Sequence, residues 1–208
     1  MKNIAVLVSG GGTNLQALID AHARGEIQNA LFSLVLSSNP DAYALTRAKK
    51  ANIPTLVVNH ADYPDRESFT EAILHEFDRR GIDLIILAGF NYILSPAFTS
   101  RYAGRIMNVH PALIPSFCGS GFYGLRTHRA VLEAGVKLTG ATVHFVNEVA
   151  DGGPIILQKA VEVKEGDTPE VLQRRVMEEA EWKLLPRAVD LFCRDKLQIE
   201  GHIVHILP

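Results

Sequence analysis

The sequence of 208 residues lacks the defining features of several protein classes. It has only two cysteines, Cys118 and Cys193, which are too few for the disulfide framework of a small secreted domain. No apolar run approaches the ~20 residues that span a bilayer, and no basic region with an apolar signal core precedes the first predicted strand. These absences exclude a disulfide scaffold, and they predict a cytoplasmic protein that does not contact membranes.

An excess of charge of one sign is also missing. Lys and Arg number 21, Asp and Glu number 23, and the net charge is −2, whereas a sequence-independent nucleic-acid binder carries a basic surface. This balance of charge predicts no nucleic-acid partner. No Cys and His residues have the spacing of metal ligands, so we also expect no metal. The composition, 47% hydrophobic and 21% charged, and the length predict a single globular domain over residues 1–208.

Apolar runs and amphipathic segments alternate through the first half of the chain. Because this alternation is typical of strands followed by helices, it predicts an α/β fold. The fold is expected to be Rossmann-like, with a mostly parallel twisted sheet and helices on both faces. The predicted strands are 3–9, 32–38, 55–58, 83–88 and 105–110, and the predicted helices include 42–51 and 66–80.

The pattern changes after Pro115. A glycine-rich loop leads into a predicted helix, two strands that we expect to extend the sheet in antiparallel fashion, a long helix and a tail strand. Thr168 is expected to cap the long helix and Pro186 to kink it. The expected ranges are 118–124 for the loop, 126–134 for the first helix, 140–146 and 155–163 for the two strands, and 203–205 for the tail strand, which closes an edge.

Three consecutive glycines, Gly10 to Gly12, separate the first strand from a helix. Bare backbone N–H groups at a helix N-terminus favour an anion, and Thr13 is expected both to cap the helix and to donate to a phosphate. The loop is not a P-loop, because no Lys-Ser/Thr pair follows, and it is not Gly-x-Gly-x-x-Gly, because position 15 is Leu. The alternative is a tight turn without a ligand, for which three adjacent glycines are more than is needed.

Asn108 and His110 end the fifth predicted strand, and Pro111 stops it. Residues two apart on a strand point to the same side, and ligands of parallel sheets bind at the carboxyl ends of strands. An amide donor and a proton-carrying imidazole suit a reaction in which a carbonyl oxygen gains charge. The alternatives are an Asn that caps the strand end and a surface His.

Four stretches, residues 8–16, 87–95, 108–115 and 143–154, resemble the phosphoribosylglycinamide formyltransferase family. The resemblance extends from residue 3 to about 186, and it implies the formyltransferase fold. It also implies transfer of the formyl group of 10-formyltetrahydrofolate to the amine of 5′-phosphoribosylglycinamide in purine synthesis (EC 2.1.2.2). The expected partners are these two small molecules, the expected cofactor set contains no metal, and the protein is expected to be a monomer or a homodimer.

The resemblance implies two binding regions and a catalytic trio. Residues 1–110 are expected to form the phosphate-binding half, and residues 111–208 the folate-site and C-terminal half. The implied ribonucleotide contacts are Gly12, Thr13, Asn14 and Glu181, with Glu179 as the alternative to Glu181 because the lengths differ by one residue. The implied folate contacts are Arg66, Asn91, Tyr92, Ile93, Leu94, Asn108, Asn147, Glu148, Val149, Ala150 and Asp151.

The implied trio is Asn108, His110 and Asp151. The substrate amine attacks the formyl carbon directly, and Asn108 and His110 stabilise the tetrahedral oxyanion. Asp151 is expected to keep His110 protonated, because a nearby carboxylate favours the imidazolium. The alternative for Asp151 is the ordinary turn residue of an Asp-Gly pair.

Departures from the family pattern fall around the folate site. The loop 117–126 is longer than in many members, Arg126 stands where many carry a His, and Tyr92 stands where an Arg is common. These differences leave the folate contacts and the proton relay open.

Four other functions compete with this interpretation. They are another 10-formyltetrahydrofolate-using transferase, a formyltetrahydrofolate hydrolase, a non-catalytic module that binds a phosphorylated ligand, and a nicotinamide dehydrogenase. The dehydrogenase predicts an acidic residue at the end of the second strand, but that strand ends in Ser37, Ser38 and Asn39.

Overall fold

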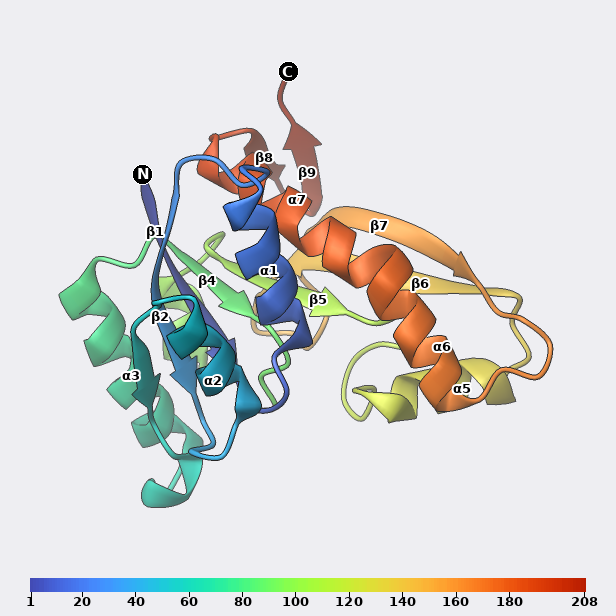
Figure 1. Cartoon of the computed structure of the whole chain (residues 1–208), viewed down its shortest axis with the longest axis horizontal. Coiled ribbons are helices and arrows are strands. Elements are labelled where there is room, and N and C mark those ends of the chain that lie inside the picture. The colour runs from blue at the N-terminus through green and yellow to red at the C-terminus, as the bar shows by residue number, and fades with distance from the viewer.

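The computed structural model describes residues 1–208 and has an α/β fold built on one nine-stranded sheet (Figure 1). The strand order is β3-β2-β1-β4-β5-β6-β7-β9-β8, and β3 through β5 in this order are parallel. The strands are β1 (Lys2–Val8), β2 (Ala30–Ser37), β3 (Thr55–Val57), β4 (Leu84–Leu87), β5 (Ile106–His110), β6 (Leu138–Phe145), β7 (Ile155–Glu162), β8 (Leu197–Glu200) and β9 (Ile203–Ile206). The predicted parallel sheet is therefore confirmed.

Helices cover both faces of the sheet, as predicted. In Figure 1, α1 and α7 cross in front of the sheet, and one core lies between the sheet and α1, α2, α5, α6 and α7. The other core packs against α3 and α4. The helices are α1 (Thr13–Ala23), α2 (Tyr43–Lys50), α3 (Arg66–Arg80), α4 (Pro96–Arg101), α5 (Leu125–Glu133), α6 (Pro169–Val176) and α7 (Trp182–Cys193), with a single turn η1 at His60–Asp62.

Strand β1 shows why these apolar runs become central strands. Successive side chains on a strand point to opposite faces, so Ile4, Val6 and Val8 enter one core while Ala5 and Leu7 enter the other. All five residues are fully buried. A strand that is covered on both faces needs a continuous apolar run, which is what residues 4–8 supply.

The C-terminal half extends the sheet in antiparallel fashion, as predicted, but two details of the tail differ. Strands β5, β6 and β7 pair antiparallel, whereas β9 pairs with β7 in parallel. The tail is also a hairpin in which β8 pairs with β9, so β8 forms the edge of the sheet. The expectation that a single tail strand closes the edge is wrong. The signal for β8 was weak, because its four residues alternate between polar and apolar types over a short stretch.

The long helix is interrupted before Pro186, not at it. A π-helical turn, η2 (Met177–Glu181), separates α6 from α7, and Pro186 lies inside α7. The turn ends immediately before Trp182. The Trp182 carbonyl receives no helical hydrogen bond from residue 186, because Pro186 has no N–H. The expected interruption is therefore real, but it is a bulge one turn upstream.

Three loops meet at the carboxyl edge formed by β1, β4 and β5. They are the glycine loop (residues 10–14), the apolar loop (residues 89–95) and the covering loop (residues 116–124). Ser9 joins the first two, since its N–H donates to Gly89 O at 3.1 Å and its Oγ accepts from Asn91 N–H at 3.0 Å. None of the helices combines the length and the apolar character needed to cross a membrane.

Candidate active site

The glycine loop presents a run of free backbone donors. The N–H groups of residues 10–15 form no hydrogen bond within the protein, and they border a cavity of about 310 Å³. The expected cap is wrong: Gly12 is the N-cap residue with φ +73°, and Thr13 is the first helical residue. The helix stays uncapped because Gly12 has no side chain, and Thr13 Oγ1 instead donates to Met177 Sδ, at 3.7 Å. An uncapped helix N-terminus with unpaired donors is a site for an anion.

The far wall of this cavity comes from the C-terminal half of the chain. Gln173 and Met177, on α6 and η2, line it opposite the glycines. Sequence reasoning missed both residues because nothing in the local pattern shows which helix turn will face the loop. The cavity therefore draws on both predicted halves of the chain.

Glu181 lies deep beside the glycine loop, and Glu179 is exposed. Glu181 is 6% exposed, and its Oε2 accepts a hydrogen bond from Asn14 Nδ2 at 2.8 Å. Burial raises the pKa of Glu181 to about 7, with the Asn14 hydrogen bond opposing it. The π-helical turn accommodates the extra residue in this segment and turns Glu181 inward. The structure thus brings Glu181, not Glu179, to Asn14.

Asn108, His110 and Asp151 meet at the end of β5. His110 Nδ1 lies 3.3 Å from Asp151 Oδ2, and the two side chains are 4% and 14% exposed. Asp151 comes from the aspartate loop (residues 146–153), which follows β6 and folds back over the sheet. Asp151 has φ +54°, a left-handed conformation that Asp adopts more readily than most residues. The loop is therefore a turn, and it also delivers the carboxylate to His110.

His144 on β6 pairs with Asn108 across the strands and holds its side chain. The Nδ1 of His144 lies 2.8 Å from Phe145 O, an acceptor, so Nδ1 carries the hydrogen. In the neutral ring Nε2 is then an acceptor, and it receives Asn108 Nδ2–H at 3.2 Å. The 3.5 Å approach of Nε2 to Asp151 Oδ1 becomes a hydrogen bond only when this ring is protonated. With a neutral His144 ring, the hydrogen bond of Nε2 is therefore the shorter one, to Asn108.

The covering loop occupies the polar atoms of the trio. Its Phe117 O lies 2.8 Å from His110 Nε2, and its Gly119 N–H donates to Asp151 Oδ2 at 2.8 Å. Phe117 has φ +49°, which is unusual for an aromatic residue and marks a strained turn. Because a carbonyl only accepts, Nε2 of His110 carries the hydrogen and Nδ1 faces the carboxylate. Sequence reasoning missed these two contacts because both come from backbone atoms.

The electrostatics of the trio bear on the expectation that Asp151 keeps His110 protonated. Burial lowers the pKa of His110, and Asp151 and the Phe117 carbonyl raise it only in part. Burial also raises the pKa of Asp151, but the neighbouring His144 and His110 rings and the Gly119 N–H together lower it below its usual value. Asp151 thus acts on His110 in the expected direction, but desolvation outweighs the charge pair in this conformation, so the pKa of His110 lies below its ordinary value.

The formyl transferase family model matches residues 2–189 of the chain. The chain belongs to this family. A phosphoribosylglycinamide formyltransferase of Haemophilus influenzae is 40% identical over 206 residues, which cover 99% of the chain and 94% of that protein. A glycinamide ribonucleotide transformylase from Symbiobacterium toebii has a TM-score of 0.94 and 43% identity over 100% of the chain and 95% of the solved chain. These matches place the chain in the phosphoribosylglycinamide formyltransferase branch of the family.

Two further relatives carry the same fold within longer chains. The human trifunctional purine biosynthetic protein adenosine-3 is 44% identical over 94% of the chain, which spans only 19% of that protein. A formyltetrahydrofolate deformylase from Pseudomonas syringae has a TM-score of 0.89 but 25% identity, and the chain spans 66% of it. The identity is thus higher with the transferases than with this deformylase.

The apolar loop only partly matches the folate slot expected from the family. Leu94 is buried, Ile93 is 66% exposed, and the Tyr92 ring stacks on His60 with centroids 4.2 Å apart. Tyr92 therefore packs into an aromatic cluster with Phe69 and Phe90 on the protein side.

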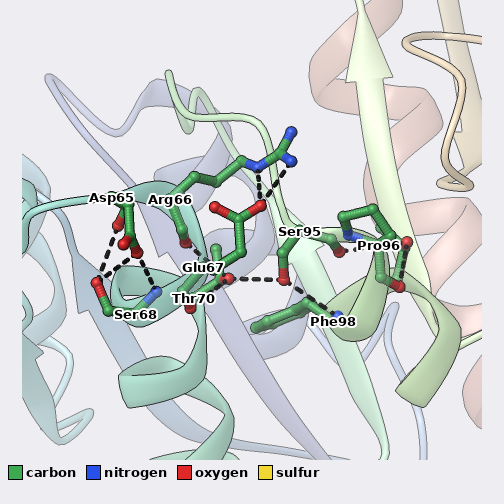
Figure 2. A network of polar contacts seen from close by, with 9 residues as sticks. Asp65, Arg66, Glu67, Ser68, Thr70, Ser95, Pro96 and Phe98 are labelled. Atoms are coloured by element: carbon green, nitrogen blue, oxygen red, sulfur yellow. Dashed lines mark hydrogen bonds and ion pairs between the residues drawn. The ribbon is translucent and has the colours of Figure 1, made fainter.

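Arg66, the predicted folate contact on α3, is paired with its neighbour in this structure. Figure 2 shows its guanidinium against Glu67, with Arg66 Nη2 2.6 Å from Glu67 Oε1. One turn later Thr70 Oγ1 donates to Ser95 Oγ at 2.7 Å, which ties α3 to the end of the apolar loop. Arg66 is exposed, so the Glu67 pair is weak enough for another carboxylate to replace it.

The aspartate loop lines a second cavity, of about 430 Å³. Asn147, Glu148 and Val149 form one wall, and the others come from α4 and from Ile199 on β8. Asn91 to Leu94 do not line this cavity. Ala150 and Val149 are exposed, and Val149 is 65% exposed.

Three residues near the trio remain outside it. Arg126 points to solvent over the Tyr123 ring, 4.9 Å from its centroid. His128 is fully buried with no hydrogen-bond partner on either nitrogen, and burial lowers its pKa to about 4. Burial raises the pKa of the Cys118 thiol, which donates to Pro115 O. No group of three or more His, Cys, Asp and Glu side chains is arranged to hold a metal ion.

Proposed function

We infer that this member of the family transfers the formyl group of 10-formyltetrahydrofolate to the amine of 5′-phosphoribosylglycinamide, in purine biosynthesis (EC 2.1.2.2). The observation that carries this inference is the pairing of two features at one edge of the sheet. One is the run of unpaired N–H groups over residues 10–15, and the other is the Asn108, His110 and Asp151 trio. Direct transfer from a donor to a phosphorylated amine needs both.

The ribonucleotide is assigned to the glycine-loop cavity. Its phosphate accepts hydrogen bonds from the N–H groups of Gly12, Thr13 and Asn14, where the dipole of α1 adds attraction. Glu181 and Asn14 are the polar side chains below the loop, and Glu181 is suited to a ribose hydroxyl. The proposed role of Glu181 requires that its hydrogen bond to Asn14 shifts when the ligand enters.

The folate is assigned to the space between the apolar and aspartate loops. Ile93 and Val149 each expose more than 60% of their surface, and such side chains gain from apolar cover by a flat ring. Backbone groups of Asn91 to Leu94 and of Asn147 to Asp151 are assigned to its polar edge, and Arg66 to a carboxylate of its tail. Asn108 serves both the folate and the reaction.

A neutral His110 suits the proton balance of the transfer. The amine nitrogen forms a bond to the formyl carbon and becomes positively charged, and its proton passes to His110 Nε2, which the shift of the covering loop frees from Phe117 O while the ring hydrogen lies on Nδ1 beside Asp151. The carbon then loses its bond to the folate nitrogen, and that nitrogen takes the proton from His110. These two proton transfers require a base that is neutral before the first step and neutral again after the second.

Asp151 and Asn108 stabilise the charges that appear in between. The 3.3 Å contact from His110 Nδ1 to Asp151 is longer than the ~2.8 Å of a charge-assisted hydrogen bond, so it strengthens when the ring takes up the second proton and becomes cationic. Asn108 uses one Nδ2 hydrogen on His144, and its other is free for the oxyanion. A donor of this kind contributes ~3 kcal/mol to transition-state stabilisation. Because His110 is only 3% exposed, the covering loop shifts when the substrates bind.

The test is an assay of 10-formyltetrahydrofolate consumption with and without 5′-phosphoribosylglycinamide. Consumption that requires the ribonucleotide and yields its N-formyl product supports the proposed function. Equal consumption in its absence indicates a hydrolase. We also expect turnover to be unchanged by a metal chelator, and the protein to sediment as a monomer or a homodimer.

A further inference from the structure

The carbonyls of Gly10 and Gly11, the first two of the glycine triplet, are both hydrogen-bonded to helix α2. The Ala44 N–H, at the start of the helix, donates to Gly10 O at 3.1 Å. Arg47 Nε, one turn later, donates to Gly11 O at 2.8 Å. The outer surface of the triplet is thereby attached to α2 at two successive peptides.

These two bonds fix the direction of the donors on the other side. A trans peptide is planar, and its C=O and N–H point in opposite directions. When Gly10 O is held by α2, the N–H of Gly11 points away from α2. When Gly11 O is held by Arg47, the N–H of Gly12 does the same, and both N–H groups are unpaired.

The direction of these dipoles matters because the cavity has no cation. The residues that line it are glycines, Thr13, Asn14, Ala88, Gln173 and Met177, with no Lys or Arg among them. A dianionic phosphate there depends on neutral donors, chiefly the backbone N–H groups, and on the helix dipole. A peptide that turned over would replace an N–H with a carbonyl oxygen, which repels the phosphate.

Arg47 is itself held in place by three contacts. Beyond Gly11 O, its Nη1 donates to Gln16 Oε1 at 3.0 Å, and its guanidinium lies 5.0 Å from the centroid of the Tyr43 ring. The loop also packs closely on α2, since a Cβ at Gly12 would lie 2.6 Å from the Ala44 Cβ. A guanidinium with these bonds is ordered before any ligand arrives.

We propose that Arg47 is a positioning residue for the substrate phosphate: by holding the Gly11 carbonyl on the α2 side, it aims the Gly12 N–H into the binding cavity. Arg47 does not line that cavity and does not contact the reacting atoms. Of the two hydrogen bonds from α2 to the Gly10 and Gly11 carbonyls, only the one from Arg47 comes from a side chain, so it is the one that substitution can remove. The proposal rests on the proposed function, which places a phosphate in this cavity.

The experiment compares Arg47→Ala and Arg47→Lys with the control Lys49→Ala, an exposed cation on the same helix. Kinetics are measured with 5′-phosphoribosylglycinamide and with its dephosphorylated nucleoside analogue. For Arg47→Ala we expect the KM of the phosphorylated substrate to rise about tenfold, since hydrogen bonds to charged groups are worth roughly that factor or more. The kcat, the KM of the folate and the KM of the nucleoside analogue are expected to change less than about twofold.

Arg47→Lys retains a donor that can reach Gly11 O, so it should recover part of the lost affinity, and Lys49→Ala should resemble the unsubstituted enzyme. An equal loss with both substrates would show that Arg47 only supports the fold, and would overturn the proposal. If the unsubstituted enzyme bound the two substrates equally well, the phosphate assignment itself would fail, which is a distinct result. Thermal unfolding midpoints identify a variant that does not fold. If Arg47→Ala does not fold, Arg47→Lys tests the proposal by the same comparison of KM values for the phosphorylated substrate and the nucleoside analogue.

Discussion

The glycine loop and the catalytic trio differ in what their polar groups do before any substrate binds. The N–H groups of residues 10–15 are unpaired and face a cavity. His110 and Asp151 are almost completely enclosed, and each is hydrogen-bonded by the backbone of the covering loop. The ribonucleotide end of the proposed site is thus already formed, whereas the catalytic end is covered.

Solvation explains the difference. Donors at the exposed mouth of a cavity can be satisfied by water at little cost, so they can remain free of protein partners. A buried imidazole and carboxylate cannot, and leaving either unpaired would cost ~1–3 kcal/mol or more. Their partners in the resting protein are therefore protein atoms, which must be exchanged for substrate atoms during turnover.

The largest effect is expected for His110→Ala, which removes the proton carrier. Turnover should fall by about 10³-fold, within the range of general acid–base catalysis, while folate affinity measured by fluorescence titration should change little. His75→Ala, the same change at an exposed position on α3, should leave turnover unchanged. Near-normal turnover in the His110 variant would exclude this residue from the mechanism.

Gly153→Ala should disturb the catalytic trio and leave ribonucleotide binding at the glycine loop intact. A Cβ at Gly153 would lie 1.8 Å from Phe145 O, so the aspartate loop has to move and carry Asp151 away from His110. We expect turnover to fall about 10²-fold, as for a ~1 Å displacement of a catalytic group. Ribonucleotide affinity, measured by isothermal titration calorimetry, should stay within about twofold. A parallel loss of ribonucleotide affinity would show that the two ends are not independent.

Glu181→Gln tests the buried acid below the glycine loop through its pH dependence. The folded-state pKa of Glu181 is raised from 4.5 to about 7, so the folded protein binds this proton more tightly than the unfolded chain does. That stabilisation is fully present below pH 4.5 and is lost as the pH rises through 7. Relative to the Gln variant, the native protein should lose up to about 3 kcal/mol of unfolding free energy across that window. Urea unfolding at pH 5 and pH 8 measures it, and a pH-independent difference would contradict the burial argument.

The smallest effect is expected for Asp151→Asn on the titration of His110. Asp151 raises the pKa of His110 against the larger, opposite effect of burial, so removing the carboxylate should lower that pKa further. An NMR titration of the His110 ring measures the shift. An unchanged pKa would mean that the carboxylate does not act on the imidazole at all.

Prediction from the sequence worked best where a local pattern determines the structure. The apolar runs became central strands, α3 begins and ends where its periodicity predicted, and the loop from Asn147 to Asp151 does bring a carboxylate to His110. These features depend on the pattern of side chains and on turn residues, both of which can be read directly from the amino-acid sequence.

The missed features depend on tertiary environment or on the backbone. Burial of His110 lowers its pKa against the expected effect of Asp151, because desolvation depends on what the fold places around the ring. Phe117 and Gly119 act through a carbonyl and an N–H that every residue has, so their identity gives no signal. Gln173 and Met177 reach the glycine loop through the packing of the last helices on the sheet, which no local pattern predicts.

The most direct test is amide hydrogen exchange, followed by NMR, in the free protein and with each substrate. In the free protein the Gly119 amide, which is bonded to Asp151, should be protected, and the amides of Gly12 to Asn14 should exchange rapidly. The ribonucleotide alone should protect the glycine-loop amides and leave Gly119 unchanged, whereas adding a folate analogue should release Gly119. Protection of the glycine loop without ligand, or a Gly119 amide that exchanges rapidly from the start, would contradict the account.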